Sequence, residues 1–261
     1  MRAAREQRIQ PAGIGIATAG AVDDRDGSIF AATDNLPGWA GFELRAFSHE
    51  RFRLPVSVVN DAQAAVLSEL HFGRGRGLSD FVVITLGTGV GGGIVSGGRL
   101  IRGQHGFAGS IGHSVIHAGG HPCNCGRKGC LEAYVSTAAL LRAYRDHGGV
   151  VAGESNDDAT LALRINQLAR AGDGAAQSAY ACMAEHLAEG VANLFNLFDP
   201  EAVILSGGLI EGYPAFITNV QERVKALLHF GEKRQPRLCA ATTGRFAGVQ
   251  GAASLVLDTG C

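Results

Sequence analysis

Three cysteines and one histidine lie close together near the middle of the chain. Cys123, Cys125 and Cys130 share one short segment, and His113 precedes them. Three thiolates and one imidazole would complete a closed tetrahedral site, which predicts a structural rather than a hydrolytic zinc ion. Glycines within the segment let the backbone turn tightly around an ion. Free or disulfide-linked cysteines are the alternative interpretation.

A glycine-rich segment, GTGVGGGIVSGG, follows the apolar run Phe81 to Leu86. This run predicts a buried strand. The glycines permit positive φ and leave backbone N–H groups open to a phosphate, and Thr88 adds a hydroxyl. The segment is not a Walker A loop, because no Gly-Lys-Ser/Thr follows. A tight β-hairpin is the alternative, and the tip of such a hairpin can itself bind phosphate.

Asp61 is the candidate catalytic carboxylate. It lies where a predicted strand, Leu54 to Val59, gives way to a predicted helix that begins AQAAVL. A carboxylate at this point can cap the helix. It can also act as a general base at the carboxyl end of a strand, where α/β enzymes bind their ligands. The residue types alone leave both interpretations open.

The composition narrows the class of protein. The 261 residues include 23 Lys and Arg against 24 Asp and Glu, and this balance argues against a protein that binds nucleic acid through charge. No apolar run is long enough to cross a bilayer, and the first residues lack the apolar core of a signal peptide. The other three cysteines are scattered, which fits a reducing cytoplasm. We expect a cytoplasmic protein without a membrane or nucleic-acid partner.

Predicted helices and strands alternate along the chain, which indicates an α/β fold with layered sheets. A strand at Ala202 to Leu205 is followed by the turn Ser206-Gly207-Gly208, which suits close approach to a flat ligand such as a nucleobase. Predicted helices include Ala133 to Tyr144, Ala175 to Phe198 and Ala247 to Leu257.

Several motifs occur in one order: ATAGAVD, NLPGW, VVNDAQAA, LGTGVGGGIVSGGRLIRGQHGFAG, IGH, CNCGRKGCLEAY and ILSGG. With them the chain resembles the ROK family of sugar kinases and related repressors over nearly its whole length. The resemblance implies a two-domain, actin-like ATPase (ribonuclease H-like) fold with a cleft between the domains. Residues 1–77 would form a small domain with the sugar site, residues 78–246 a large domain with the nucleotide site, and the closing helix 247–261 would return to the small domain.

The resemblance also implies roles for individual residues. Asp61 would be the general base, Asn60 would bind the sugar beside it, and His113 would ligate zinc with one nitrogen and face the sugar with the other. The implied substrate-binding residues are Gly20, Asn35, Asn60, Asp61, Ser110, His113 and Glu132. The implied nucleotide-binding residues are Gly87, Thr88, Gly89, Val90, Gly91, Gly92 and Gly93 for the phosphates, and Gly207 and Gly208 for adenosine.

The sequence departs from the family pattern in two places. Kinases of the family begin with a strand that carries Asp-x-Gly-Gly-Thr, and this motif is absent here. We therefore expect the first domain to lack its initial strands, which would compromise activity and expose a sheet edge that invites pairing with another chain. Ser110 stands where the family has a sugar-binding glutamate. Some N-acetylmannosamine kinases of the family also depart from Glu there and share NDAQAA, which favours N-acetylmannosamine as the substrate.

We expect ATP-dependent phosphorylation of a hexose or N-acetylhexosamine, with N-acetylmannosamine as the first candidate, to its 6-phosphate. A glucokinase- or fructokinase-type kinase and a catalytically silent sugar-binding regulator are the alternatives. The implied cofactors are ATP, Mg²⁺ and a structural Zn²⁺, and the implied partners are a small-molecule sugar and a second copy of the chain in a homodimer.

Overall fold

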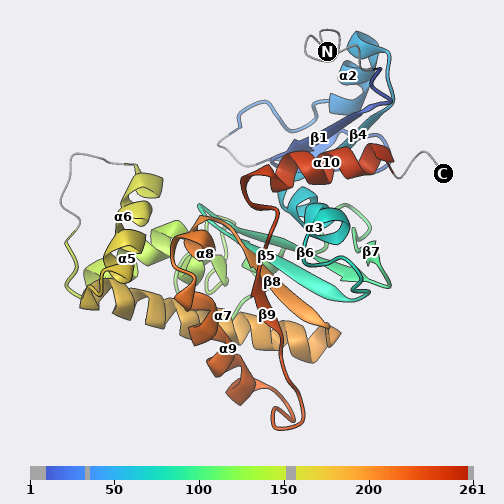
Figure 1. The fold of residues 1–261 in the computed structure, drawn as a ribbon. Helices are drawn as coiled ribbons and strands as arrows, with labels where there is room; N and C mark the ends of the chain where they lie inside the picture. The colour runs from blue at the N-terminus through green and yellow to red at the C-terminus, as the bar shows by residue number, and fades with distance from the viewer. Residues whose placement is uncertain (1–9, 33–35, 151–156, 258–261) are drawn as a thin grey trace.

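The computed structural model describes residues 10–32, 36–150 and 157–257 (Figure 1). Helices and strands alternate through these segments, which confirms the predicted α/β class. The strands are β1 (Ile14–Thr18), β2 (Ala21–Val22), β3 (Ile29–Ala31), β4 (Val56–Asn60), β5 (Phe81–Leu86), β6 (Val90–Ser96), β7 (Arg99–Leu100), β8 (Ala202–Ser206) and β9 (Leu238–Ala240). The helices are α2 (Leu44–Phe52), α3 (Asp61–Phe72), α4 (Glu132–Val135), α5 (Thr137–Asp146), α6 (Asp158–Arg170), α7 (Gly174–Phe198), α8 (Gly208–Gly212), α9 (Ala215–Leu227) and α10 (Ala247–Leu257), with short 3₁₀ helices η1 (Ile111–His113) and η2 (Gly244–Phe246).

The larger sheet has the strand order β7-β6-β5-β8-β9, with β5 at its centre. β5 runs antiparallel to β6 and parallel to β8. Successive side chains of β5 point to opposite faces. Val82 belongs to the main core, which includes much of α7, whereas Phe81 packs with Val66 of α3. Both faces are therefore covered, and this is why the run of β5 is apolar almost throughout.

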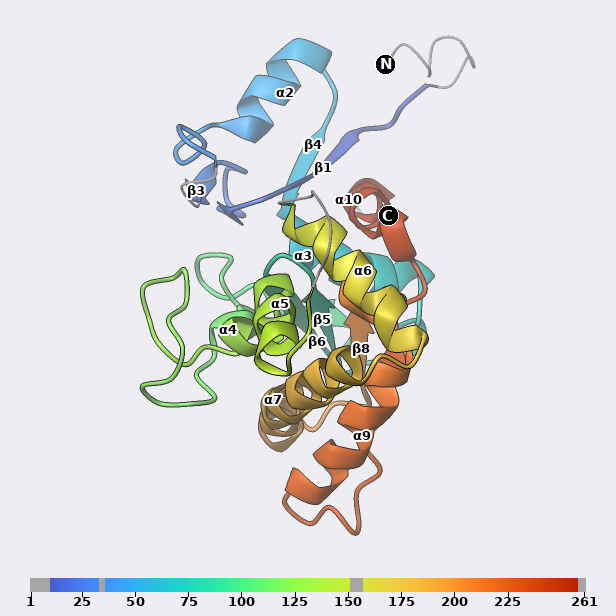
Figure 2. The ribbon, with the colours of Figure 1, turned by 90° about the vertical axis from the view of Figure 1, so that its left-hand side faces the viewer.

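Helices α5, α6, α7 and α9 pack together on the side of this sheet that faces the main core (Figure 2). α7 is the longest of the described helices. It begins after Asp173, whose carboxylate accepts a hydrogen bond from the N–H of Ala176 at 2.8 Å, and it ends before Asp199, at φ 44°. Within the described residues, no helix combines the length and apolar character needed to cross a bilayer.

The second sheet pairs β1 in parallel with β4. Helices α10 and α3 pack on each other and on β1, so the last described helix lies beside the first described strand (Figure 1). The packing leaves no room for side chains at the contacts. A Cβ at Gly251 would lie 1.7 Å from the carbonyl oxygen of Ala64, and a Cβ at Gly15 would lie 1.9 Å from that of Ala252. Among the described residues, this sheet has only these two strands.

The Glu69 carboxylate accepts hydrogen bonds from two chain segments that connect the sheets, one after α3 and one before α10. The residue is 1% exposed, and its carboxylate has no cationic partner among the described contacts. Oε2 accepts from the N–H of Arg74 at 2.7 Å. Oε1 accepts from the N–H groups of Thr242 and Thr243, both at 2.9 Å, and from the Thr243 hydroxyl at 2.7 Å. The segment after α3 and the segment before α10 are thus held at one buried carboxylate.

The glycines of β6 differ from the expectation of positive φ. Gly91, Gly92 and Gly93 lie within a regular strand, and none of them has positive φ. Their role is close packing. A Cβ at Gly92 would lie 2.4 Å from the carbonyl oxygen of Val83, and a Cβ at Gly93 would lie 2.8 Å from Cγ2 of Val66 in α3. The β-hairpin interpretation of this segment is confirmed, with Leu86 paired to Val90 across the tip.

Candidate functional site

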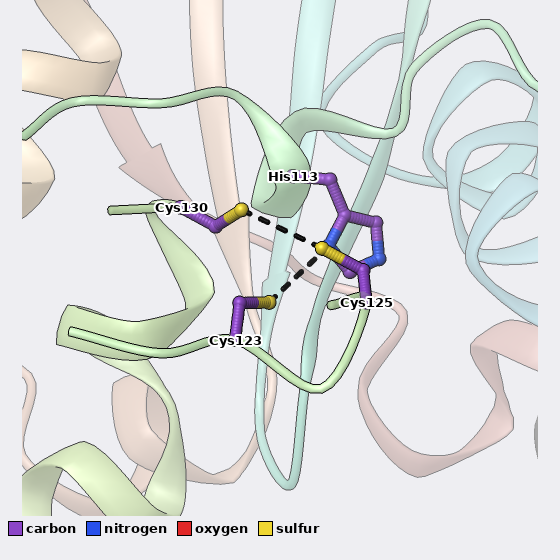
Figure 3. Close-up of side chains that lie close together, drawn as sticks. All are labelled: His113, Cys123, Cys125 and Cys130. Atoms are coloured by element: carbon purple, nitrogen blue, oxygen red, sulfur yellow. Dashed lines mark hydrogen bonds between the residues drawn. The ribbon is translucent and has the colours of Figure 1, made fainter. Parts of the chain in front are cut away.

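The predicted metal ligands come together. His113 ends η1, and the three cysteines lie on the loop that follows (Figure 3). One ligand atom from each of His113, Cys123, Cys125 and Cys130 lies within 4.8 Å of the others. Sγ of Cys125 is 3.6 Å from Sγ of Cys130, and Sγ of Cys123 is 3.7 Å from Nδ1 of His113. Zinc bonds of about 2.0–2.3 Å give tetrahedral edges of roughly 3.5–3.8 Å, so the four residues fit a zinc ion.

Backbone turns shape this loop. The N–H of Cys123 donates to the carbonyl of Arg127 at 2.8 Å, and the N–H of Gly126 donates to the carbonyl of Cys123 at 3.0 Å. Gly126 and Gly129 adopt φ of 85° and 82°. A Cβ at Gly129 would also lie 1.7 Å from the carbonyl oxygen of His117. Glycine is required at position 129 on both counts, and the tight wrapping predicted from the sequence is confirmed.

Burial favours the protonated form of two of the three thiols. Burial raises the pKa of Cys123 to about 12 and also raises the pKa of Cys130. The backbone N–H of Arg127 lowers the pKa of Cys125. Without an ion, the two raised values keep those cysteines protonated at neutral pH. A zinc ion deprotonates the thiols that coordinate it, so metal binding would release protons.

The helix cap beside Asp61 is made by its neighbour. Asn60 has β-region φ and ψ, and its Oδ1 accepts from the N–H groups of Ala62 at 2.9 Å and Gln63 at 3.3 Å. Its Nδ2 donates to the carbonyl of Gly20 at 2.9 Å. Asp61 occupies the first helical position, with Oδ1 accepting from the N–H of Ala62 at 2.8 Å. Asp61 is exposed and is not needed as the cap.

Asp61 borders two adjoining cavities. The first has a volume of about 370 Å³ and the second about 470 Å³. The first is lined by Gly20, Ala21, Ala31, Ala32, Asn60, Asp61, Ala62, Gln63, Val90, Gly91, Gly92, Gly106, Phe107, Ala108, Gly109, Ser110 and His113. The second is lined by Asp61, Ala62, Thr85, Thr88, Gly89, Val90, Gly91 and Glu132. The carboxylate at position 61 therefore lies at the junction of the two.

Most of the predicted sugar residues meet in the first cavity. Gly20, Asn60, Ser110 and His113 all line it, and Asn35 lies outside the described residues. The hydroxyl of Ser110 donates to the carbonyl of Phe107 at 2.7 Å, which leaves its oxygen as an acceptor.

Glu132 lies on the second cavity, beside the predicted phosphate residues. Its Oε2 accepts from the N–H of Val90 at 2.9 Å, and its Oε1 lies 3.7 Å from Sγ of Cys123. The Glu132 side chain thus connects the cysteine loop to the β5–β6 hairpin. The N–H of Val90 is occupied by this bond.

The hairpin tip and the turn after β8 lie at the same edge of the large sheet. The tip closes through the N–H of Gly87, which donates to the carbonyl of Gly89 at 3.0 Å. Gly207 adopts φ 102°, and a Cβ there would lie 2.2 Å from the carbonyl oxygen of Leu86 at the end of β5. Gly208 begins α8. Ligands of α/β proteins bind at such carboxyl edges.

Comparison with known proteins identifies the family. A model described as the ROK family matches residues 1–259. The chain belongs to the ROK family. A glucokinase of Halalkalibacterium halodurans is 36% identical over 94% of this chain and 76% of its own length. An N-acetylmannosamine kinase of Escherichia coli is 37% identical over 93% of this chain and 78% of its own.

Solved ROK structures confirm the fold. A ROK glucokinase of Streptomyces griseus, in complex with glucose and AMPPNP, superposes with a TM-score of 0.82 at 33% identity, covering 98% of this chain and 85% of that one. The α/β chain therefore has the actin-like ATPase fold of ROK kinases. The family also contains regulators. A xylose repressor of Bacillus spizizenii is 29% identical over 94% of this chain, which spans 61% of the repressor.

The segment 106–109 of the loop between β7 and η1 lines the first cavity, which was not predicted from the sequence. The loop between β7 and η1 contacts the β2–β3 hairpin and closes the first cavity. Gln63 is 5% exposed, and its Nε2 donates to the carbonyl of Gly106 at 3.0 Å. Arg102 forms an ion pair with Asp24 at 2.5 Å. Gln63 lies inside the motif NDAQAA, but its spacing from Asp61 does not reveal which distant loop it contacts.

Proposed function

We propose that this ROK chain transfers the γ-phosphoryl group of ATP to the 6-hydroxyl of a hexose or N-acetylhexosamine. One observation carries the proposal: Asp61 borders both cavities, one lined by predicted sugar residues and the other by predicted phosphate residues. Phosphoryl transfer needs the acceptor hydroxyl and the phosphate in line, with a base beside the hydroxyl. The glucokinase and N-acetylmannosamine kinase relatives support the same reaction class.

Asp61 is the proposed general base. Because Asn60 caps α3, the carboxylate is free to face a ligand, and its bond to the N–H of Ala62 limits its rotation. As the sugar oxygen attacks phosphorus, its proton passes to Asp61. The bond between the γ-phosphorus and the bridging oxygen breaks, and ADP leaves. A positioned base of this kind contributes about 10²- to 10⁴-fold to the rate.

His113 is proposed to orient the sugar. Its Nδ1 lies toward the cysteines, and the residue also lines the first cavity, so Nε2 is available to a sugar hydroxyl (Figure 3). A zinc ion held by His113 and the three cysteines would supply a fixed positive centre that sets the tautomer and angle of the ring. We propose a structural role for this ion, because all four tetrahedral positions are filled by protein.

The nucleotide is proposed to bind along the second cavity. Thr88 and Gly89 would approach the phosphates, and Gly207 and Gly208 would approach adenosine. Magnesium prefers carboxylate, hydroxyl and water oxygens. Glu132 and Thr88 line this cavity with that type of donor, and they would orient the Mg²⁺ that accompanies ATP, directly or through water. The other glycines of β6 would support the hairpin rather than contact phosphate, since their faces are packed against other residues.

N-acetylmannosamine is the proposed substrate among the amino and neutral hexoses. Ser110 offers an uncharged acceptor where a carboxylate would bind two hydroxyls of an unsubstituted sugar. Small apolar residues, Ala31, Ala32 and Ala108, line the same cavity. An acetamido group needs a methyl-sized apolar surface, and these residues would supply it.

A coupled ADP-release assay across a sugar panel tests the proposal. The panel contains N-acetylmannosamine, N-acetylglucosamine, glucose, mannose and fructose, with folded, metal-loaded protein. We expect kcat/KM to be highest for N-acetylmannosamine, and Ser110→Glu to shift the preference toward glucose, while Ser110→Ala does not. A wild-type preference for glucose would favour the glucokinase-type alternative. Turnover with none of the sugars, even after an upstream segment that carries Asp-x-Gly-Gly-Thr is restored, would refute the kinase proposal.

A sugar-sensing regulator is the second candidate, and the similarity to the xylose repressor favours it. A regulator needs the first cavity but not phosphoryl transfer. Titration calorimetry separates the two functions. Sugar binding with micromolar to millimolar affinity, combined with no ADP release in the presence of ATP and Mg²⁺, would support the regulator.

A further inference from the structure

A second group of metal-ligating side chains lies where the cysteine loop meets α7. His117 and His121 belong to the segment between His113 and the first cysteine, and His186 and Cys182 belong to α7. Nε2 of His117 lies 3.0 Å from Nδ1 of His186. The two rings are 5.0 Å apart and nearly perpendicular, at 89°. None of these residues belongs to the four-ligand group at His113.

We propose that His117 and His186 bind a second transition-metal ion, of the zinc or nickel class, that joins the cysteine loop to α7. Imidazole nitrogen suits these ions. Two nitrogens bound at about 2.0–2.1 Å in a tetrahedral shell lie roughly 3.3 Å apart. The observed 3.0 Å therefore requires the rings to separate by a few tenths of an ångström, and to tilt toward an ion that lies beside the line between the nitrogens, when the ion replaces the shared proton.

The surroundings supply what a metal-bound histidine needs at its other nitrogen. Sγ of Cys182 lies 3.8 Å from Nε2 of His186. When Nδ1 binds the ion, Nε2 carries the hydrogen and donates it to this sulfur, which fixes the tautomer. The Tyr134 ring packs against His117, His121 and His186, with centroids 4.9, 5.0 and 4.6 Å away. Both ligand rings are thus held in place before the ion arrives.

Water can reach the remaining coordination positions from the side of His117, which is exposed. A cavity of about 100 Å³ adjoins the other ligand residue, His186, and is lined also by His121, Asp146, His147 and Cys182. These polar side chains can bond to water around His186. The ion would tie the loop that carries His117 to a core helix. The site is separate from the proposed catalytic cleft, so it does not depend on the kinase proposal.

Equilibrium dialysis of the 261-residue protein against buffered Zn²⁺, followed by elemental analysis, tests the site. We expect the wild-type chain to hold one zinc more than His117→Gln or His186→Gln. Exposed His229, outside the cluster, provides the matched control, and His229→Gln should retain the wild-type count. Circular dichroism checks that each variant is folded. Equal zinc counts in wild type and both cluster variants would mean that the pair is only a hydrogen bond, and the proposal would be wrong.

A second measurement needs no substitution. The wild-type protein is loaded with ¹¹³Cd²⁺ and examined by ¹¹³Cd NMR. We expect two resonances, one from a sulfur-rich site and one shifted to the range of nitrogen and oxygen ligands. A single sulfur-type resonance at saturating Cd²⁺ would overturn the second site even if the histidine variants failed to fold.

Discussion

Replacing Asp61 by Asn separates the catalytic role of this residue from its place in a helix. The substitution keeps the size of the side chain and an oxygen that can accept from the N–H of Ala62, now 2.8 Å from Oδ1. It removes the proton acceptor. Loss of a general base lowers kcat by about 10²- to 10⁴-fold, or about 2.7–5.4 kcal/mol of transition-state stabilisation. We expect KM for the sugar to change only a few-fold.

The effect of Asp61→Asn on stability should be small. The cap of α3 is made by Asn60, so the main loss is one negative charge at a helix N-terminus, worth about 0.3–1 kcal/mol. In a chain of this size, such a loss lowers Tm by only about 1–4 °C. Asp158 offers a matched control, because it is also exposed and in the first turn of its helix, α6. Asp158→Asn should show a similar stability change and unchanged activity.

The coupled ADP-release assay, with thermal unfolding of the same samples, decides the outcome. If Asp61→Asn kept activity within tenfold of wild type, Asp61 would not be the base. If it unfolded the protein, the assignment of the cap to Asn60 would be wrong. If Asp158→Asn lost the same activity, the loss at position 61 would reflect helix charge rather than catalysis.

Three further outcomes are expected. Removal of zinc by a chelator, or by Cys125→Ser, should lower Tm and raise KM for the sugar more than KM for ATP. Equal increases in both KM values would contradict the proposal that zinc positions His113 to bind the sugar. Glu69→Ala should lower the free energy of unfolding, measured in urea, by about 3 kcal/mol or more, since it leaves several buried donors without an acceptor. Glu69→Gln keeps one acceptor oxygen and should lower this free energy by less. Gly92→Ala should destabilise the protein by about 1–3 kcal/mol through overpacking. Gly174→Ala, at a position with open space around it, should be neutral or stabilising. Equal effects of the two substitutions would refute the packing argument.

Regular elements were the most predictable part of the fold. The apolar run Phe81–Leu86 and the helix Ala247–Leu257 have the bounds expected from the sequence, and α7 differs by one residue at its start. Apolar runs and helical periodicity record burial directly. The predicted helix Ala133 to Tyr144 is instead divided into α4 and α5 at Ser136. The side chain of Ser136 accepts from the N–H of Ala139 at 3.4 Å and starts a second helix.

The candidate site was predictable where ligand chemistry fixes spacing, as at the cysteine loop. It was less predictable where contacts join distant segments. The two roles of Asp61 could not be told apart from residue types alone, because the answer depends on the side chain of Asn60 and its bond to Gly20. The glycines of β6 resembled a phosphate loop in sequence, but strand pairing and the approach of α3 explain them.

A structure of the protein with N-acetylmannosamine and a non-hydrolysable ATP analogue tests the central claim most directly. The account predicts that the sugar 6-hydroxyl lies about 2.6–3.2 Å from an Asp61 carboxylate oxygen, in line with the γ-phosphorus, while Nε2 of His113 contacts another sugar hydroxyl. A sugar bound with its 6-hydroxyl beyond hydrogen-bonding distance of Asp61, or a nucleotide that does not reach the second cavity, would contradict it.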